Sequence, residues 1–176
     1  MAISATINKV TLNIADMDRH YYQSHDITAA QHPSETDYRF MMRMIAFAYN
    51  ASENLRFTKG LSSEDEPEIW QKSLIDDIEL WIDFGQLDDK RIRKACGRSD
   101  QVIIYTYNEG KASVWWEQIK TKLDRYTNLS IYQVLVEDDI ASLVNRNMQL
   151  QCNIEDGEMY LGDDETSFSV RLSKRK

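Results

Sequence analysis

The chain has 176 residues, of which 42% are hydrophobic, and a formal net charge of −8. That length and composition suffice for one substantial core, so we expect a single domain over residues 1–176. The first residues, MAISATINKV, lack the basic start and unbroken apolar run of a secretory signal, and no window approaches the ~18 apolar residues of a membrane span. These features argue against secreted and membrane-spanning classes and predict a soluble, cytoplasmic protein with no membrane partner.

Cysteine and histidine give no metal or redox signal. Cys96 and Cys152 are too few and too far apart in the sequence for a disulfide framework or a zinc knuckle. Cys152 alternates with Leu150 and Ile154 at strand spacing, so it is predicted to be a small buried hydrophobic residue rather than a nucleophile or ligand.

Acidic and basic residues occupy separate stretches of the chain. Residues 62–89 hold ten acids and Lys72 as the single base, a net charge of −9, so the rest of the chain sums to +1. The segment KRIRKACGR, residues 90–98, follows directly. Nucleic-acid binders usually carry excess lysine and arginine, and the total charge argues against such a partner. Because the charges are segregated, however, that total describes no single surface.

The chain is predicted to begin with strands. Residues 2–15 alternate apolar and polar positions, first in the phase of Ile3 to Ile7 and then in the phase of Val10 to Ile14. The shift of phase at Asn8-Lys9 predicts a bulge or bend. The segment DMDRHYYQSHD, residues 16–26, is predicted to supply a hairpin partner through a polar turn.

A helix is predicted within HPSETDYRFMMRMIAFAYNAS, residues 32–52. Ser34 with Asp37 three residues later resembles a capping box, and apolar residues recur at helical spacing from Tyr38 to Tyr49. Glu35 falls on the core-facing stripe, so its carboxylate is predicted to point inward. The alternative is an ordinary N-terminal acid stabilised by the helix dipole.

Three strands, a helix and a strand follow. The strands are expected over residues 55–61, 66–72 and 77–84, and Gly85 ends the last of them. A short basic helix is predicted over 88–96, and the apolar run 100–108 reads as a strand buried on both faces. The order of elements is therefore helix, strand, strand, strand, helix, strand.

The last third is predicted to contain a helix over 113–126, a strand over 129–136, a helix over 137–145 and a hairpin over 148–172. Asp156-Gly157 is the hairpin turn. The fold class expected for the whole chain is α/β, of the α+β kind with a mixed sheet. Dinucleotide, phosphate-loop, HExxH and EF-hand patterns are absent from the sequence.

The acids on these strands suggest a divalent cation. Like charges a few ångströms apart raise each other's pKa unless a positive group intervenes, and Mg²⁺ prefers carboxylate oxygens with water and phosphate. Glu68, Asp83 and Glu35 are predicted to converge on such an ion, with Lys72 countering part of the charge. For Glu64, Asp65, Asp76, Asp88 and Asp89, solvated surface charge is the expected role.

Several short segments resemble the YaeQ family of bacterial proteins: HPSET, FTKGL, DEPE, LWIDFG, RIRKAC, the later WW and the DG hairpin. The order of elements resembles the core of the PD-(D/E)XK nuclease-like superfamily, here with N-terminal and C-terminal β-hairpins. The resemblance implies that Pro67-Glu68 takes the "PD" position, Asp83 the second acidic position and Glu35 the helix acid. Gly85 stands where the pattern has lysine. Lys72 and Lys94 are the candidates to replace that catalytic cation.

Two hypotheses follow from these residues. The first is a Mg²⁺-dependent phosphodiester hydrolase acting on nucleic acid, with Glu35, Glu68 and Asp83 as metal ligands. The second is a non-catalytic module that binds nucleic acid or a protein partner through the basic helix, using Lys90, Arg91, Arg93 and Lys94. Gly85 and the acidic total favour an inactive or specialised site over a general nuclease.

Overall fold

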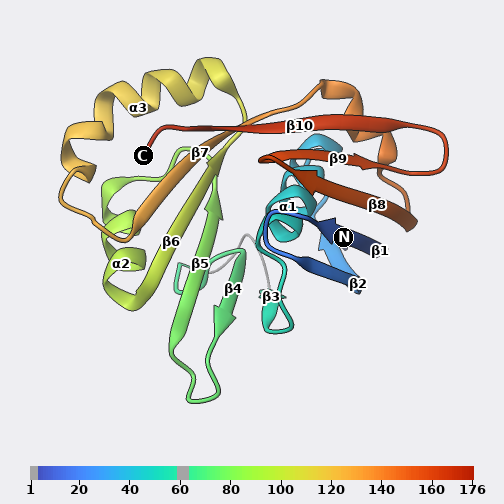
Figure 1. Ribbon diagram of the computed structural model, residues 1–176. Coiled ribbons are helices and arrows are strands. Elements are labelled where there is room, and N and C mark those ends of the chain that lie inside the picture. Colours follow the sequence, from blue (N-terminus) through green and yellow to red (C-terminus); the bar gives the residue numbers. More distant parts are fainter. Residues whose placement is uncertain (1–3, 59–63) are drawn as a thin grey trace. The chain divides into compact units, whose positions relative to one another are not determined.

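The computed structural model describes residues 4–58 and 64–176, which group into two compact units (Figure 1). Unit 1 takes in the described residues of Met1–Asn50 and Leu135–Leu172, and unit 2 those of Ala51–Val134 and Ser173–Lys176. The prediction of one domain over the chain stays a prediction. Ile3 and the predicted strand end at Lys59-Gly60 lie outside the described residues. Among the described residues, no helix has the length and apolar character needed to cross a membrane.

Unit 1 contains a mixed sheet in the order β2-β1-β8-β9-β10. Its strands are β1 (Thr6–Asp16), β2 (Tyr21–Gln31), β8 (Asn147–Glu155), β9 (Glu158–Gly162) and β10 (Ser167–Lys174), the end of which belongs to unit 2. The β1–β8 pair is parallel, and the β1–β2, β8–β9 and β9–β10 pairs are antiparallel.

The predicted bulge in the first strand is absent. The β1–β2 register runs unbroken from Thr6↔Gln31 to Asp16↔Tyr21. Even-numbered residues of β1 from Asn8 to Asp16 are buried, and so Asn8 is only 2% exposed whereas Ile7 is 52% exposed. The change of phase in the sequence therefore marks a polar side chain placed on the core face, not a change in backbone geometry.

Helix α1 (Asp37–Asn50) supplies most of the helical core of unit 1. Every residue from Phe40 to Ala48 is buried, including Arg43. Ser34 does not cap the helix; the Arg39 N–H donates instead to Thr36 Oγ1 at 3.1 Å. The predicted helix over 137–145 is a 3₁₀ helix, η1 (Asp138–Leu143), and it packs against α1.

The strands of unit 2 are hydrogen-bonded in the order β7-β6-β5-β4-β3. They are β3 (Leu55–Phe57), β4 (Ile69–Lys72), β5 (Ile78–Phe84), β6 (Ser99–Thr106) and β7 (Leu129–Leu135). The β3–β4 and β4–β5 pairs are antiparallel and the β5–β6 and β6–β7 pairs are parallel.

Helices α2 (Asp89–Arg98) and α3 (Glu109–Leu123) are the crossovers of those parallel strands, and they lie together beside the sheet (Figure 1). Their apolar residues Ile92, Ala95, Ile119 and Leu123 form one core with Trp81, Val102, Ile104 and Ile131. The observed order α1-β3-β4-β5-α2-β6 is the order expected from the sequence. The mixed α+β class is confirmed.

Candidate functional site

Asp83, on β5, lies buried at the centre of a group of donors in unit 2. Its Oδ2 accepts from the Trp81 indole N–H and from Arg91 Nε, both at 2.9 Å. Its Oδ1 accepts from Arg91 Nη2 at 3.1 Å and from the Glu68 backbone N–H at 3.3 Å. The arginine fork and carboxylate thus form a two-point ion pair, the geometry in which such pairs are strongest.

Arg91 is positioned by the start of α2. The Asp88 side chain caps this helix by accepting from the Arg91 N–H at 2.7 Å. The Arg91 guanidinium, with 25% of its side chain exposed, also donates to the Glu66 carbonyl at 3.1 Å. Arg91, on α2, therefore contacts both Glu66 in the segment before β4 and Asp83 on β5. Arg91 is thus a structural contact within unit 2. Its contact with nucleic acid, expected from the sequence, stays a prediction.

Glu35 lies in unit 1, and it is neutralised by two arginines of α1. Its Oε2 accepts from Arg39 Nη1 and its Oε1 from Arg43 Nη2, each at 2.6 Å. The Glu35 side chain is 1% exposed and that of Arg43 is 8% exposed. The inward-pointing carboxylate predicted from the sequence is observed, with arginine as its partner.

The donors around these carboxylates bear on the predicted Mg²⁺ site. Both oxygens of Asp83 and both oxygens of Glu35 already accept hydrogen bonds from arginine. An ion would have to displace guanidinium groups that carry the charge a metal would supply, so these two residues as placed do not fit Mg²⁺. Over residues 4–58 and 64–176, no three His, Cys, Asp or Glu side chains are grouped to hold a metal. The magnesium assignment stays a prediction.

The two lysines predicted to assist hydrolysis have other partners. Lys72 Nζ lies 3.3 Å from Asp76 Oδ1 and 4.0 Å from the centre of the Trp70 ring. Lys94 forms an ion pair with Asp65 on the surface. Within the described part of the chain, neither ammonium group forms an ion pair with Glu68 or Asp83.

Gly85 follows Asp83 by two residues and has a positive φ of 90°. A Cβ at this position would meet nothing within 4 Å, so space does not require glycine. The backbone does, because side chains other than glycine are strained at this φ. Its N–H donates to the Tyr105 carbonyl at 2.9 Å, which holds the end of β5 against β6. A lysine in this place would have to adopt that strained backbone.

The exposed face of α2 carries cations. Lys90, Arg93 and Lys94 are all exposed and recur at helical spacing. Among the described residues, no carboxylate forms an ion pair with Lys90 or Arg93. The basic helix therefore divides into an inward residue, Arg91, and an outward group.

Neither cysteine has the character of a nucleophile. Burial raises the pKa of the Cys96 thiol to about 11 and that of Cys152 to about 12. At neutral pH both thiols are protonated, and a protonated thiol is a poor nucleophile and metal ligand.

The arginine partners of the two acids were not predicted. Arg39 and Arg43 follow Glu35 by four and eight residues, and this spacing places side chains on one helical stripe. That signal was available. The Asp83–Arg91 pair left no comparable signal, because a turn between β5 and α2 separates the two residues.

Comparison with known proteins gives one consistent result. The family model described as "YaeQ protein" matches residues 1–172. The uncharacterised protein YaeQ of Escherichia coli K12 is 41% identical over 175 residues, covering 98% of this chain and 97% of that protein. The crystal structure of YaeQ protein from Xanthomonas axonopodis pv. citri has a TM-score of 0.93 at 38% identity, covering 98% of this chain and 99% of the other. That from Pseudomonas syringae has 0.89 at 32%, covering 98% and 96%.

Proposed function

We propose that this chain, which belongs to the YaeQ family, is a non-hydrolytic module whose α2 face binds the phosphate backbone of nucleic acid. The observation that carries the proposal is that the cations of α2 have two different environments. Arg91 forms an ion pair with the Asp83 carboxylate, while Lys90 and Arg93 are exposed to solvent. The acidic position of the nuclease-like pattern is thereby neutralised and a cationic surface remains.

Phosphate recognition needs little more than such a surface. Lysine and arginine side chains neutralise phosphates and release condensed counterions, which makes binding steeply dependent on salt. These contacts carry no sequence information by themselves. Trp81 is fully buried and is not available to stack on a base. We therefore expect weak, sequence-independent binding.

The finer fold assignment belongs to the same proposal. Its support is the order α1-β3-β4-β5-α2-β6, with Glu68 and Asp83 joined by the backbone hydrogen bond described above. In this view the chain is a PD-(D/E)XK-like protein in which Arg91 occupies the charge-balancing role that a metal ion has in hydrolytic members. Fold alone does not fix activity.

The test is the salt dependence of binding to mixed-sequence single-stranded and duplex DNA and RNA of about 20 nucleotides. The variant Lys90→Gln/Arg93→Gln should reduce the slope of log K against log salt by about 2. The matched control is Lys111→Gln/Lys122→Gln, which removes two exposed cations of α3 and should leave binding unchanged. Equal losses in both variants, or no binding by the wild type, would overturn the proposal. A protein partner would then be the remaining candidate for this face.

Mg²⁺-dependent phosphodiester hydrolysis is the alternative, favoured by the same order of elements. It requires cleavage of some DNA or RNA by the wild type with Mg²⁺ or Mn²⁺, and loss of that cleavage in Asp83→Ala. The absence of cleavage over a broad substrate panel would remove it, and retained binding in the same samples would support the non-hydrolytic module.

A further inference from the structure

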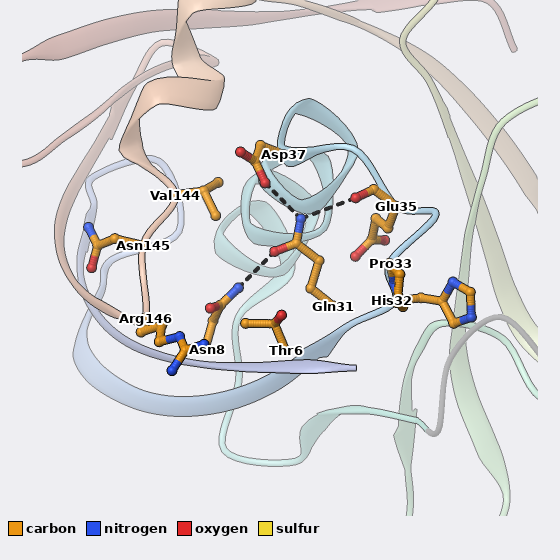
Figure 2. A pocket seen from close by; sticks show the side chains of 10 residues that line it. All are labelled: Thr6, Asn8, Gln31, His32, Pro33, Glu35, Asp37, Val144, Asn145 and Arg146. Carbon is orange, nitrogen blue, oxygen red and sulfur yellow. Dashed lines mark hydrogen bonds between the residues drawn. The ribbon is translucent and has the colours of Figure 1, made fainter. Parts of the chain in front are cut away.

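Unit 1 holds a polar pocket that the proposed function does not use (Figure 2). Its cavity volume is about 360 Å³, which is within the range of small-molecule sites, roughly 300–1,000 Å³. The walls come from the beginning of β1, the segment joining β2 to α1, and the segment between η1 and β8. All of these lie in unit 1.

Two side-chain amides form a fixed chain along this pocket. Asn8 Nδ2 donates to Gln31 Oε1 at 2.9 Å, and Gln31 Nε2 donates to Asp37 Oδ1 at 2.8 Å and to the Glu35 carbonyl at 3.2 Å (Figure 2). These bonds settle the orientation of both amides. They also use every polar group of the Gln31 side chain as donor or acceptor.

Asn8 has an acceptor left over. Its side chain is almost wholly buried and its nitrogen is directed to Gln31, while in Figure 2 its oxygen lies on the side of Arg146. No donor from the described part of the chain bonds to Asn8 Oδ1. The oxygen is accessible from the pocket, so a ligand can donate a hydrogen bond to it there in place of solvent.

Opposite charges stand at two ends of the pocket. Arg146 lines one end and Asp37 the other, with the Asn8–Gln31 chain between them (Figure 2). Within residues 4–58 and 64–176, neither side chain forms an ion pair. Glu35 also lines the pocket, but Arg39 and Arg43 neutralise it, so it does not repel an anionic ligand.

We propose that this pocket binds a small zwitterion of the amino-acid class. The ligand's carboxylate pairs with the Arg146 guanidinium. Its ammonium group donates to Asn8 Oδ1 on the Arg146 side, and the Asp37 carboxylate at the other end of the pocket attracts its positive charge. Arginine suits a carboxylate because its fork can bind both oxygens at once, and the preformed amide chain means that the pocket needs little reorganisation.

The experiment is a thermal-shift and ¹⁵N-NMR titration of the full chain with each of the twenty common amino acids, at concentrations up to about 10 mM, which is tenfold above a Kd of about 1 mM. Propionate and ethylamine serve as ligand controls, because each carries only one of the two charges. At least one amino acid should raise the melting temperature and shift the amide signals of Asn8, Gln31 and Asp37. Neither control compound should match it.

Variants then locate the site. Arg146→Gln should weaken binding at least tenfold, and Asp37→Asn should weaken it while keeping the bond to Gln31. Arg171→Gln removes an exposed arginine elsewhere in unit 1 and should bind as the wild type does. No amino acid binding, or undiminished binding by Arg146→Gln, overturns the proposal. Amino acid binding should be unchanged in Lys90→Gln/Arg93→Gln, because the pocket does not include the α2 face. Failure of one proposal would therefore leave the other intact.

Discussion

Glu35 in unit 1 and Asp83 in unit 2 are both buried carboxylates balanced by arginine, yet they are held in different ways. Glu35 meets two arginines of one helix, and the more buried of them, Arg43, is itself 8% exposed. Asp83 meets one arginine that is 25% exposed, together with an indole and a backbone N–H. The first is an ion pair inside the core, and the second is an ion pair at its edge.

This difference indicates which site each region can support. The Glu35 carboxylate pairs with two arginines of α1, so the polar groups of the neighbouring pocket are not needed to balance its charge. At Asp83 the partners close over the carboxylate itself. Asp83 was predicted from the sequence to act in the chemistry of the site. Its carboxylate oxygens nevertheless accept more hydrogen bonds than those of Glu35. Burial of an acid on a strand is therefore not by itself evidence of a catalytic role.

The largest effect is expected from Glu35→Gln. This change removes the carboxylate charge with which Arg43 pairs inside the core, and breaking a buried pair in this way costs about 3–5 kcal/mol. The free energy of unfolding from urea denaturation measures the loss. Glu155→Gln is the control, since Glu155 is an exposed acid of the same unit.

The double variant Glu35→Gln/Arg43→Met separates lost charge from lost packing. Removing the second charge should restore at least about 1 kcal/mol, because an apolar side chain of similar length needs no counterion. If Glu35→Gln unfolds at the same urea concentration as Glu155→Gln, Glu35 is not balanced by Arg43 in the manner described.

A smaller loss is expected from Asp83→Asn. Its partner Arg91 can turn toward water when the carboxylate is removed, so the cost should be that of hydrogen bonds to a charged group, about 1.5–3 kcal/mol. Urea denaturation again gives the value.

A double-mutant cycle with Arg91→Met assigns that loss. The two changes together should cost less than their sum by about 1 kcal/mol or more, because either one alone breaks the same pair. Strict additivity would mean that Asp83 is stabilised by Trp81 and the backbone and not by Arg91.

The sequence predicted the elements that depend on local pattern. The apolar residues that recur at helical spacing from Tyr38 to Tyr49 predicted α1, and the short basic helix predicted over 88–96 is observed as α2, Asp89–Arg98. The order of elements along the chain from α1 to β6 was also predicted. These features depend on residues close in the chain, where periodicity and capping are informative.

The partners of charged residues were harder to predict. Arg91 was assigned to nucleic acid because a charge pattern gives the sign of a side chain and not its direction. The change of phase at Asn8-Lys9 was interpreted as a bulge or bend, although a polar residue in an unbroken alternation has the same appearance. In both cases the missing information is a contact between separate elements. Such a contact leaves no periodic pattern in a single sequence.

The smallest effect concerns the surface pair Asp65–Lys94, which completes the comparison because 78% of the Asp65 side chain is exposed. The hydrogen bond and charge of Lys94 lower the pKa of Asp65. A lowered folded-state pKa favours the folded state above the unfolded pKa, and this contribution disappears as the pH falls through the folded value.

Solvent screens an exposed pair, so Lys94→Met should leave the urea midpoint unchanged. The same change should raise the Asp65 pKa toward its ordinary value in a ¹³C-NMR titration, with Lys90→Met as the control that leaves it in place. An Asp65 pKa that does not move in Lys94→Met would mean that the pair is not formed in solution, and Lys94 would then join Lys90 and Arg93 as a cation available to phosphate.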